Sequence, residues 1–196
     1  MIYPALRHRA CPLCGSHDAR PEVECRQQVD DRTLEELRPF WFGIEKERHF
    51  FTYHRCAGCG LLYNRVFFDD AQLAELYSAM PPNMDQVAGD AVAATQRGYF
   101  SAVARQGPLA GGYLEIGPDV GYIVAEAVRR SDFDRFWLFE PNRAVHGRLE
   151  LASAGCPTIV LPDMTDLSAV PDGTIGLAVM VHVLDHLLAP LEMLEA

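Results

Sequence analysis

The sequence lacks the long apolar runs of an exported or membrane-spanning protein. Its longest apolar stretch, residues 175–184, contains His182, whereas a helix needs about 20 apolar residues to cross a bilayer. The N-terminal residues reach Cys11 without the apolar segment that a secretory signal requires. We therefore expect no signal peptide, no membrane partner and a cytoplasmic location.

Positive charge is scarce in most of the chain. Residues 66–196 hold seven basic and eighteen acidic side chains, a net charge of −11, whereas residues 1–65 have a net charge of +1. An acidic protein surface repels the phosphates of DNA and RNA. We therefore expect no nucleic-acid partner, and a zinc ribbon that binds nucleic acid is the least favoured function.

What is present is an ordinary globular composition, with 49% hydrophobic and 22% charged residues, divided into three regions. Residues 1–65 contain two Cys-x-x-Cys pairs and are expected to form a zinc-binding module. Residues 66–110 are expected to form a helical linker or cap, with helices over 71–79 and 85–106. The third region, residues 111–196, alternates between strand and helix patterns.

In the third region, short apolar strands are separated by helices of about 10–15 residues, which is typical of a parallel sheet. Asn142 is expected to cap a helix that ends at Gly155, and Pro190 to begin another. The sequence therefore predicts the α/β class. The expected strands are 113–116, 136–139, 158–161 and 176–181.

The two cysteine pairs have the same form, Cys11-Pro-Leu-Cys14-Gly and Cys56-Ala-Gly-Cys59-Gly. Two residues between cysteines let both thiolates reach one ion, so two such knuckles complete a tetrahedral Cys₄ zinc site. Four thiolates leave no position for a reactive water, so the Zn²⁺ is expected to be structural. The long insert 15–55 is expected to hold an additional hairpin or helix.

Two alternatives for these cysteines remain open. They could be buried thiols or a redox pair, although two matched knuckles favour metal. A histidine could also replace one of the four ligands, while Cys25 and Cys156 are expected to be core thiols. The histidines concerned are His8, His17, His49 and His54.

A glycine-containing turn follows the first strand of the third region. Gly117 and Gly121 let the backbone approach a ligand closely, and Glu140 ends the next strand, where a carboxylate can accept both hydroxyls of a ribose. Asp163, after the third strand, could bind an adenine amino group or could simply cap a turn. The pattern predicts a nucleotide-like ligand at the carboxyl ends of these strands.

The charge of the turn distinguishes between two nucleotide-like ligands, a dinucleotide and S-adenosylmethionine. A dinucleotide site favours G-x-G-x-x-G with pyrophosphate at the helix N-terminus, but here Asp119 replaces the central glycine. Glu115 and Asp119 would repel pyrophosphate and would suit the cationic end of S-adenosylmethionine. A nicotinamide-dependent oxidoreductase is therefore disfavoured.

With these motifs the sequence resembles class I S-adenosylmethionine-dependent methyltransferases that have an N-terminal zinc-binding domain, and is similar to sugar C-methyltransferases. The resemblance is carried by the two knuckles and by the segments LEIGPDVGY, LFEPN and HVLDHLLAPLEML. It implies a Cys₄ zinc-ribbon-like module followed by a Rossmann-like domain. It also implies cofactor contacts from Glu115, Gly117, Gly121, Glu140, Asp163 and Met164, with His182, Asp185 and His186 at the boundary with the substrate.

Three departures from the family pattern affect these expectations. Asp119 stands where the family has a small residue, and Gly176 stands where it often has Asp. The chain also reaches Ala196 inside the helix after the fourth strand, so we expect an incomplete sheet with strands in the order 3-2-1-4. The apolar fourth strand would then be an open edge, at which a second copy or a partner chain is expected to pair.

The predicted function is methyl transfer from S-adenosylmethionine to a small molecule, with a nucleotide-linked sugar as the candidate acceptor. His182 and His186 are the candidate bases, because imidazole titrates near neutral pH. The alternative is a catalytically inactive fragment that binds zinc and cofactor and serves as an interaction subunit.

Overall fold

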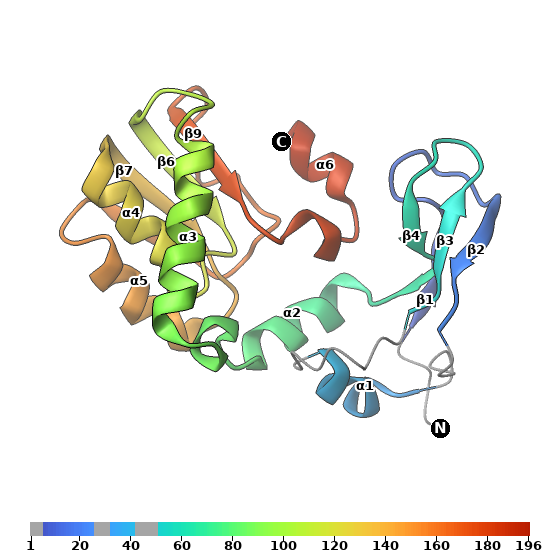
Figure 1. The fold of residues 1–196 in the computed structure, drawn as a ribbon. Helices are drawn as coiled ribbons and strands as arrows, with labels where there is room; N and C mark the ends of the chain where they lie inside the picture. Colours follow the sequence, from blue (N-terminus) through green and yellow to red (C-terminus); the bar gives the residue numbers. More distant parts are fainter. Residues whose placement is uncertain (1–5, 26–31, 42–50) are drawn as a thin grey trace. The chain divides into compact units, whose positions relative to one another are not determined.

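A computed structural model describes residues 6–25, 32–41 and 51–196 of the 196-residue chain. The chain forms two compact units (Figure 1). Unit 1 comprises Met1–Leu76 and His186–Ala196, and unit 2 comprises Tyr77–Asp185. The three-region division made from composition, with boundaries at residues 65 and 110, stays a prediction. None of the described helices is long and apolar enough to cross a membrane.

The described part of unit 1 contains two small antiparallel sheets, one of two strands in the order β1-β5 and one of three strands in the order β2-β3-β4. In chain order the strands are β1 (Arg7–His8), β2 (Ala19–Val23), β3 (Tyr53–Cys56), β4 (Leu62–Asn64) and β5 (Val66–Phe67).

Two helices in the described part of unit 1 start at reciprocal side-chain caps. At α1 (Leu34–Trp41) the Thr33 N–H donates to Glu36 over 2.8 Å, and the Glu36 N–H donates back to the Thr33 hydroxyl. At α2 (Asp70–Ala79) Asp69 and Gln72 exchange the same pair of bonds. Such boxes satisfy N–H groups that a helix start leaves unpaired. The expected helix over 71–79 is confirmed, and α1 lies in the insert where an additional element is expected.

Aromatic side chains pack together in unit 1. Trp41 meets Phe68 edge-to-face at a centroid distance of 5.2 Å and meets His186 at 5.4 Å. Phe51 and Phe67 join the same group. Such edge-to-face contacts add to the hydrophobic gain of burial.

Unit 2 is built on a four-stranded parallel sheet in the order β8-β7-β6-β9. The expected parallel sheet is therefore confirmed, although β6 and β7 begin several residues earlier than the apolar pattern indicates. The strands are β6 (Ala110–Ile116), β7 (Asp132–Phe139), β8 (Thr158–Leu161) and β9 (Ile175–Met180).

The helix predicted over 85–106 is confirmed over residues 89–103, but it begins later than predicted. The structure has a short 3₁₀ turn, η1 (Asn83–Gln86), followed by α3 (Gly89–Val103). Val87 between them is extended, with φ −119° and ψ 151°. The Met84 N–H in η1 donates to the side chain of Asp119 over 3.1 Å, so this turn is held by a long-range contact rather than by the helix.

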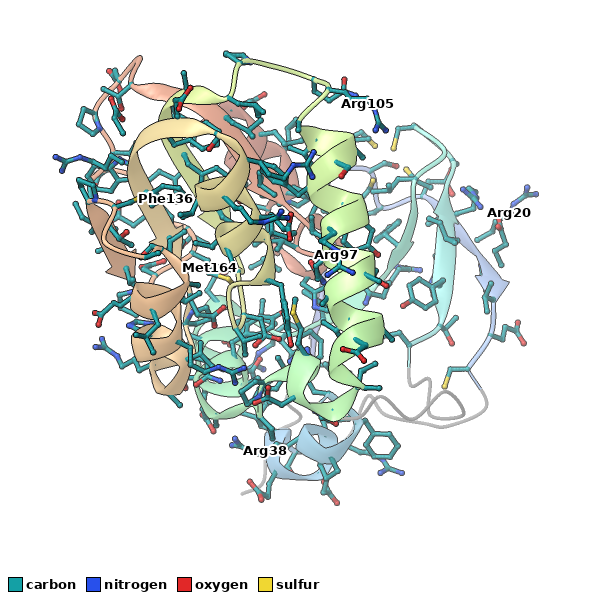
Figure 2. All side chains as sticks on the ribbon, turned by 60° about the vertical axis from the view of Figure 1, so that its left-hand side comes forward. Arg20, Arg38, Arg97, Arg105, Phe136 and Met164 are labelled. Atoms are coloured by element: carbon teal, nitrogen blue, oxygen red, sulfur yellow. The ribbon has the colours of Figure 1, made fainter. Side chains whose placement is uncertain are left out.

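Helices α3, α4 (Tyr122–Arg130) and α5 (His146–Ala152) follow one another across the sheet (Figure 1). They cover a core in which Phe100, Tyr113 and Phe136 are fully buried. Phe136 is labelled in Figure 2. Helix α4 ends at Arg130, before the extended Ser131. Asn142 caps the short η2 (Arg143–Val145) immediately before α5.

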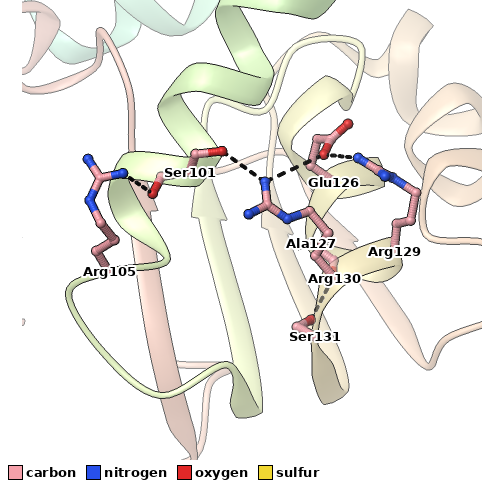
Figure 3. Close-up of polar contacts among 7 residues, drawn as sticks. All are labelled: Ser101, Arg105, Glu126, Ala127, Arg129, Arg130 and Ser131. Atoms are coloured by element: carbon pink, nitrogen blue, oxygen red, sulfur yellow. Dashed lines mark hydrogen bonds and ion pairs between the residues drawn. The ribbon is translucent and has the colours of Figure 1, made fainter.

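Polar contacts join α3 to α4 at the surface (Figure 3). Arg130 donates to the Ser101 hydroxyl over 2.9 Å and lies 3.9 Å from Glu126, which also pairs with Arg129. The Arg130 guanidinium also lies over the Phe100 ring, 5.1 Å from its centroid. These contacts fix α3 beside α4 while the apolar faces of both helices remain on the core.

The remaining elements follow β9, which is an edge strand of the sheet. Gly176 in β9 approaches β6 so closely that a Cβ there would lie 2.0 Å from the Ala110 carbonyl oxygen, and this excludes the Asp that the resembled family often has. The turn η3 (Leu184–His186) comes next, and α6 (Pro190–Glu195) begins at the proline that the sequence indicates.

The glycine turn after β6 gives a stability prediction. Gly121 has φ +85°, and a Cβ there would lie 2.9 Å from Ala152 Cβ, so we expect Gly121→Ala to lower the free energy of unfolding by about 2 kcal/mol or more. The matched control is Gly98→Ala in α3, where a Cβ meets nothing within 4 Å. It should stabilise by about 0.5–1 kcal/mol. Chemical denaturation measures both, and equal effects would contradict this account of the turn.

Candidate metal centre and ligand site

The structure brings four cysteines of unit 1 together in one group. The sulfur atoms of Cys11, Cys14, Cys56 and Cys59 all lie within 4.8 Å of one another. Two pairs, Cys11–Cys59 and Cys14–Cys56, have Sγ···Sγ distances of 3.5 Å, far longer than the ~2.05 Å of a disulfide bond. Among the described residues this is the one such group that could hold a metal ion.

The two knuckles have the same backbone pattern. The Cys11 N–H donates to the Ser16 carbonyl, and Gly15 N–H donates to the Cys11 carbonyl, both over 2.9 Å. Cys56 and Gly60 make the equivalent bonds, and both glycines have a positive φ. One turn geometry, used twice, therefore presents two pairs of sulfurs to a common point.

The sulfur spacing fits a zinc ion. Zn–S bonds of about 2.3 Å in a tetrahedral site place neighbouring sulfurs about 3.8 Å apart, which lies between the 3.5 Å of the closest pairs and the 4.8 Å limit of the group. His8, His17 and His54 are not members of the group, and His49 lies outside the described residues.

Backbone N–H groups favour thiolate at this site unevenly. The Cys59 N–H is the largest cause that lowers the pKa of Cys56, to about 6. At Cys59 the Leu61 N–H favours the thiolate, but desolvation and the other three sulfurs outweigh it and raise its pKa to about 12. Adjacent negative sulfurs repel one another, so a divalent cation is what allows all four to be thiolates.

Arg9 provides positive charge beside the cysteines. Burial lowers its pKa to about 10, while Tyr63 and Cys11 act in the opposite direction. Its guanidinium donates to Asn64 and lies 4.2 Å from the Phe67 ring centroid. Arg9 Nη1 and the Tyr63 hydroxyl are buried without a hydrogen-bond partner in the described part of the chain. A half-buried cation next to Cys11 favours an anionic tetrathiolate centre.

The metal centre gives a second prediction. We expect one zinc ion per chain by elemental analysis, and Co²⁺ in its place should give the absorption of a tetrahedral thiolate complex. Cys56→Ser should lose the metal and destabilise the fold of unit 1, because structural zinc contributes folding free energy. Cys156→Ser, in unit 2, is the matched control and should keep it. Metal content that is unchanged in Cys56→Ser would contradict the assignment.

Unit 2 holds a second candidate site, at the carboxyl end of β6. Glu115 is 3% exposed, and its Oε2 accepts a 2.6 Å hydrogen bond from the buried Tyr113 hydroxyl. Burial raises the pKa of Glu115 to about 8, and the charge of Glu140 adds to the effect. The chain thus keeps a carboxyl group where its charged form is costly.

Glu140 follows β7 and is also buried. Its Oε2 accepts the Asp119 N–H over 2.9 Å, and its Oε1 accepts the Asn142 N–H over 2.8 Å. Burial raises its pKa to about 7 although both N–H groups favour the charged form. Two backbone donors therefore hold the carboxyl group in one orientation at the end of the strand.

The turn between these carboxyl groups is shaped by its backbone. Gly117 has φ +71°, and a Cβ there would lie 2.9 Å from Val183 Cγ2. Asp119 has φ +49° without being glycine, and burial raises its pKa. The structure therefore brings together Glu115, Glu140 and the whole turn from Gly117 to Gly121.

Asp163 and Met164 lie in the loop after β8, and Met164 is labelled in Figure 2. Asp163 Oδ1 accepts hydrogen bonds from the Thr165 N–H and hydroxyl, both over 2.9 Å, so it caps a turn, which is the alternative that the sequence leaves open. Its role toward an adenine stays a prediction, as does that of Met164.

The two candidate bases lie in different units. His182, in unit 2, follows β9, and its Nε2 lies 3.1 Å from the Tyr99 hydroxyl. His186, in unit 1, packs against Trp41. Asp185, beside them in the sequence, is exposed.

Sequence reasoning misses three residues that support these side chains: Tyr113, Asn142 in its contact with Glu140, and Tyr99. Tyr113 carries a usable signal, because residues two apart in a strand face the same side and Glu115 is its neighbour there. The contact between Tyr99 and His182 spans 83 positions, and no local pattern indicates it.

The sequence was compared with protein-family models and with curated proteins, and neither comparison gives a match.

The burial of Glu115 gives a third prediction. A carboxyl group whose pKa is about 8 in the folded protein and near 4.5 when unfolded adds stability below pH 4.5, and this is lost as the pH rises through 8. Glu115→Gln, which can still accept the Tyr113 bond, should therefore be more stable than the native protein at pH 8, by about 4 kcal/mol, and the gain should vanish near pH 4.5.

Denaturation at several pH values measures this gain. The matched control is Glu150→Gln, an exposed residue on α5, which should leave the pH profile unchanged. A Glu115→Gln protein that is less stable than the native protein at pH 8 would contradict the burial argument.

Proposed function

We propose that the protein is an S-adenosylmethionine-dependent methyltransferase that acts on a small molecule. One observation carries the proposal: two buried carboxyl groups, Glu115 and Glu140, end adjacent parallel strands on either side of the turn from Gly117 to Gly121. Ligands of open α/β sheets bind at the carboxyl ends of the strands.

The charge of this site favours a cationic ligand. Burial is the largest cause of the raised pKa values of Glu115 and Glu140, and no arginine or lysine of the described residues is among the causes. A pyrophosphate would meet three acidic groups here, including Asp119, and would be repelled. A ligand with ammonium and sulfonium groups would instead stabilise the charged carboxylates.

Glu140 is suited to hold a ribose. Each of its oxygens already accepts one backbone N–H, and a carboxylate oxygen has a further lone pair for a ligand hydroxyl. The backbone donors fix the carboxylate before the ligand arrives, so little side-chain entropy is lost on binding.

The strand order supports a Rossmann-like domain of the methyltransferase type. Numbered from β6, the order β8-β7-β6-β9 reads 3-2-1-4, which is the order that the resemblance implies. In this scheme Glu115 and Glu140 end strands one and two.

S-adenosylmethionine supplies an activated methyl group on its sulfonium, and the residues of the chain orient the reactants and exclude water. Glu115 would bind the ammonium group, Glu140 the ribose, and the turn from Gly117 to Gly121 would allow close approach of the backbone. Of the two candidate bases, His182 shares unit 2 with these groups, so it is the one that we propose to face the acceptor.

We also propose that zinc is the ion of the cysteine group and that its role is structural. Four sulfur ligands fill the coordination sphere and leave no site for an activated water. The nucleotide-linked sugar acceptor, the cytoplasmic location and the pairing of a partner at β9 stay predictions.

Calorimetry with S-adenosylmethionine tests the function. Because the free carboxyl groups have pKa values of about 7 and 8, a cationic ligand should bind with proton release. Its affinity should therefore rise with pH from about 6 to 9 and then level off. Buffers of different ionisation enthalpy measure the number of protons released.

The two variants for this test lie at opposite ends of β7. Glu140→Gln should weaken binding about tenfold or more, since hydrogen bonds to charged groups contribute about 1.5–3 kcal/mol. Asp132→Asn, at the opposite end of β7, should bind normally. Binding of NADH but not of S-adenosylmethionine would contradict the proposal, and binding without methyl transfer to any acceptor would favour the inactive interaction subunit.

A further inference from the structure

His182 has an unusual backbone for a residue with a side chain. Its φ is +56°, in the left-handed region that favours glycine. The described chain has two other such non-glycine residues, Asp119 in the turn after β6 and Ala154 before Gly155. Two of the three therefore follow the carboxyl ends of β6 and β9, which are neighbours in the sheet, and strained backbone of this kind clusters at functional sites.

The next residue places His182 beside the glycine turn. Val183 is buried, and its Cγ2 would lie 2.9 Å from a Cβ at Gly117. His182 itself is exposed. The chain therefore packs Val183 inward against Gly117, while the His182 imidazole stays accessible near the carboxyl ends of β6 and β9.

Tyr99, on α3, is hydrogen-bonded to one nitrogen of the His182 ring. Its hydroxyl lies 3.1 Å from His182 Nε2, and the two rings meet edge-to-face with centroids 5.7 Å apart. Within the described part of the chain Nδ1 makes no hydrogen bond, so a ligand can reach that nitrogen.

The direction of the hydrogen bond between Tyr99 and Nε2 decides whether Nδ1 carries a proton and donates, or lacks one and accepts. A tyrosine hydroxyl can donate or accept, and the proton on a neutral imidazole takes whichever nitrogen its partner leaves free. A phenol is a good donor and a weak acceptor, whereas an unprotonated imidazole nitrogen is a strong acceptor. The stronger arrangement is therefore Tyr99 O–H donating to Nε2, with the histidine proton on Nδ1.

We propose that Tyr99 is a positioning residue that holds His182 in the Nδ1–H tautomer, so that His182 presents a hydrogen-bond donor and not a base. The consequence for catalysis rests on the proposed function. If His182 donates a hydrogen bond to the acceptor substrate, the substrate must offer it an oxygen that carries negative charge or gains it in the reaction. The donor role replaces the sequence-based expectation that His182 removes a proton.

Long-range ¹H–¹⁵N NMR correlations of the histidine rings test the tautomer directly. The spectrum is recorded on the zinc-loaded full chain at pH about 8.5, well above the ordinary pKa of histidine. His182→Asn assigns the signal, and asparagine tolerates the left-handed backbone.

Two other histidines provide internal references. His146 Nε2 lies 2.7 Å from the Glu140 carbonyl oxygen and must donate to it, which fixes the Nε2–H tautomer. His54 Nδ1 lies 3.2 Å from the Thr52 carbonyl oxygen and must carry its proton there. We expect His182 to resemble His54 in the native protein.

In Tyr99→Phe we expect His182 to change to the Nε2–H form, which neutral histidine prefers in water, while both references stay unchanged. The proposal is overturned if His182 is already Nε2–H in the native protein, or if Tyr99→Phe leaves its tautomer unchanged.

A second measurement separates donor from base in methyl transfer. An asparagine side-chain N–H stands close to the position of histidine Nδ1–H, so His182→Asn should retain about tenfold more activity than His182→Ala. Equal losses in the two variants would overturn the donor role. If the tautomer is found but S-adenosylmethionine does not bind, the proposed function fails and the tautomer assignment stands.

Discussion

The burial of two carboxyl groups at the ends of adjacent parallel strands is the constraint on which the candidate ligand site depends. Removing a carboxylate from water is costly, and the chain offsets only part of the cost: Glu115 receives one bond from Tyr113, and Glu140 receives two backbone N–H bonds. Both groups keep raised pKa values as a result. A cationic ligand would supply the missing compensation, which links the cost of the fold to a binding function.

Unit 1 also has a local feature that a bound ligand would stabilise, in this case a metal ion. Around Cys11 and Cys56 the described apolar core is small, with Tyr63 as its one other buried member. Small domains of this kind commonly depend on a metal for stability. The matched knuckles and the neighbouring cation of Arg9 suit a tetrathiolate, and a metal bound there would take the place of a larger core.

Local patterns predict much of this structure. Spacing and glycine position identify the two knuckles, alternation identifies the parallel sheet, and Pro190 marks the start of α6. Each of these features depends on residues close together in the sequence. The placement of Glu140 is also predictable, because a carboxylate that directly follows an apolar strand must lie at the carboxyl end of that strand.

The features that sequence reasoning misses depend on long-range packing. The break at Val87 accompanies a contact between Met84 and Asp119, which are far apart in the chain. His182 and His186 are four residues apart, yet one contacts Tyr99 and the other Trp41. Asp163 is a local exception: the sequence leaves its role open, and its hydrogen bonds from Thr165, two residues on, show that it caps a turn.

Direct titration of the two buried carboxyl groups tests the central claim most sharply. Carboxyl ¹³C signals of Glu115 and Glu140, assigned with single glutamine variants, can be followed with pH in the free protein and with S-adenosylmethionine. The account predicts that Glu115 titrates near pH 8 when free and at a clearly lower pH with the ligand. A Glu115 that titrates near 4.5 in the free protein, or is unaffected by the ligand, would contradict it.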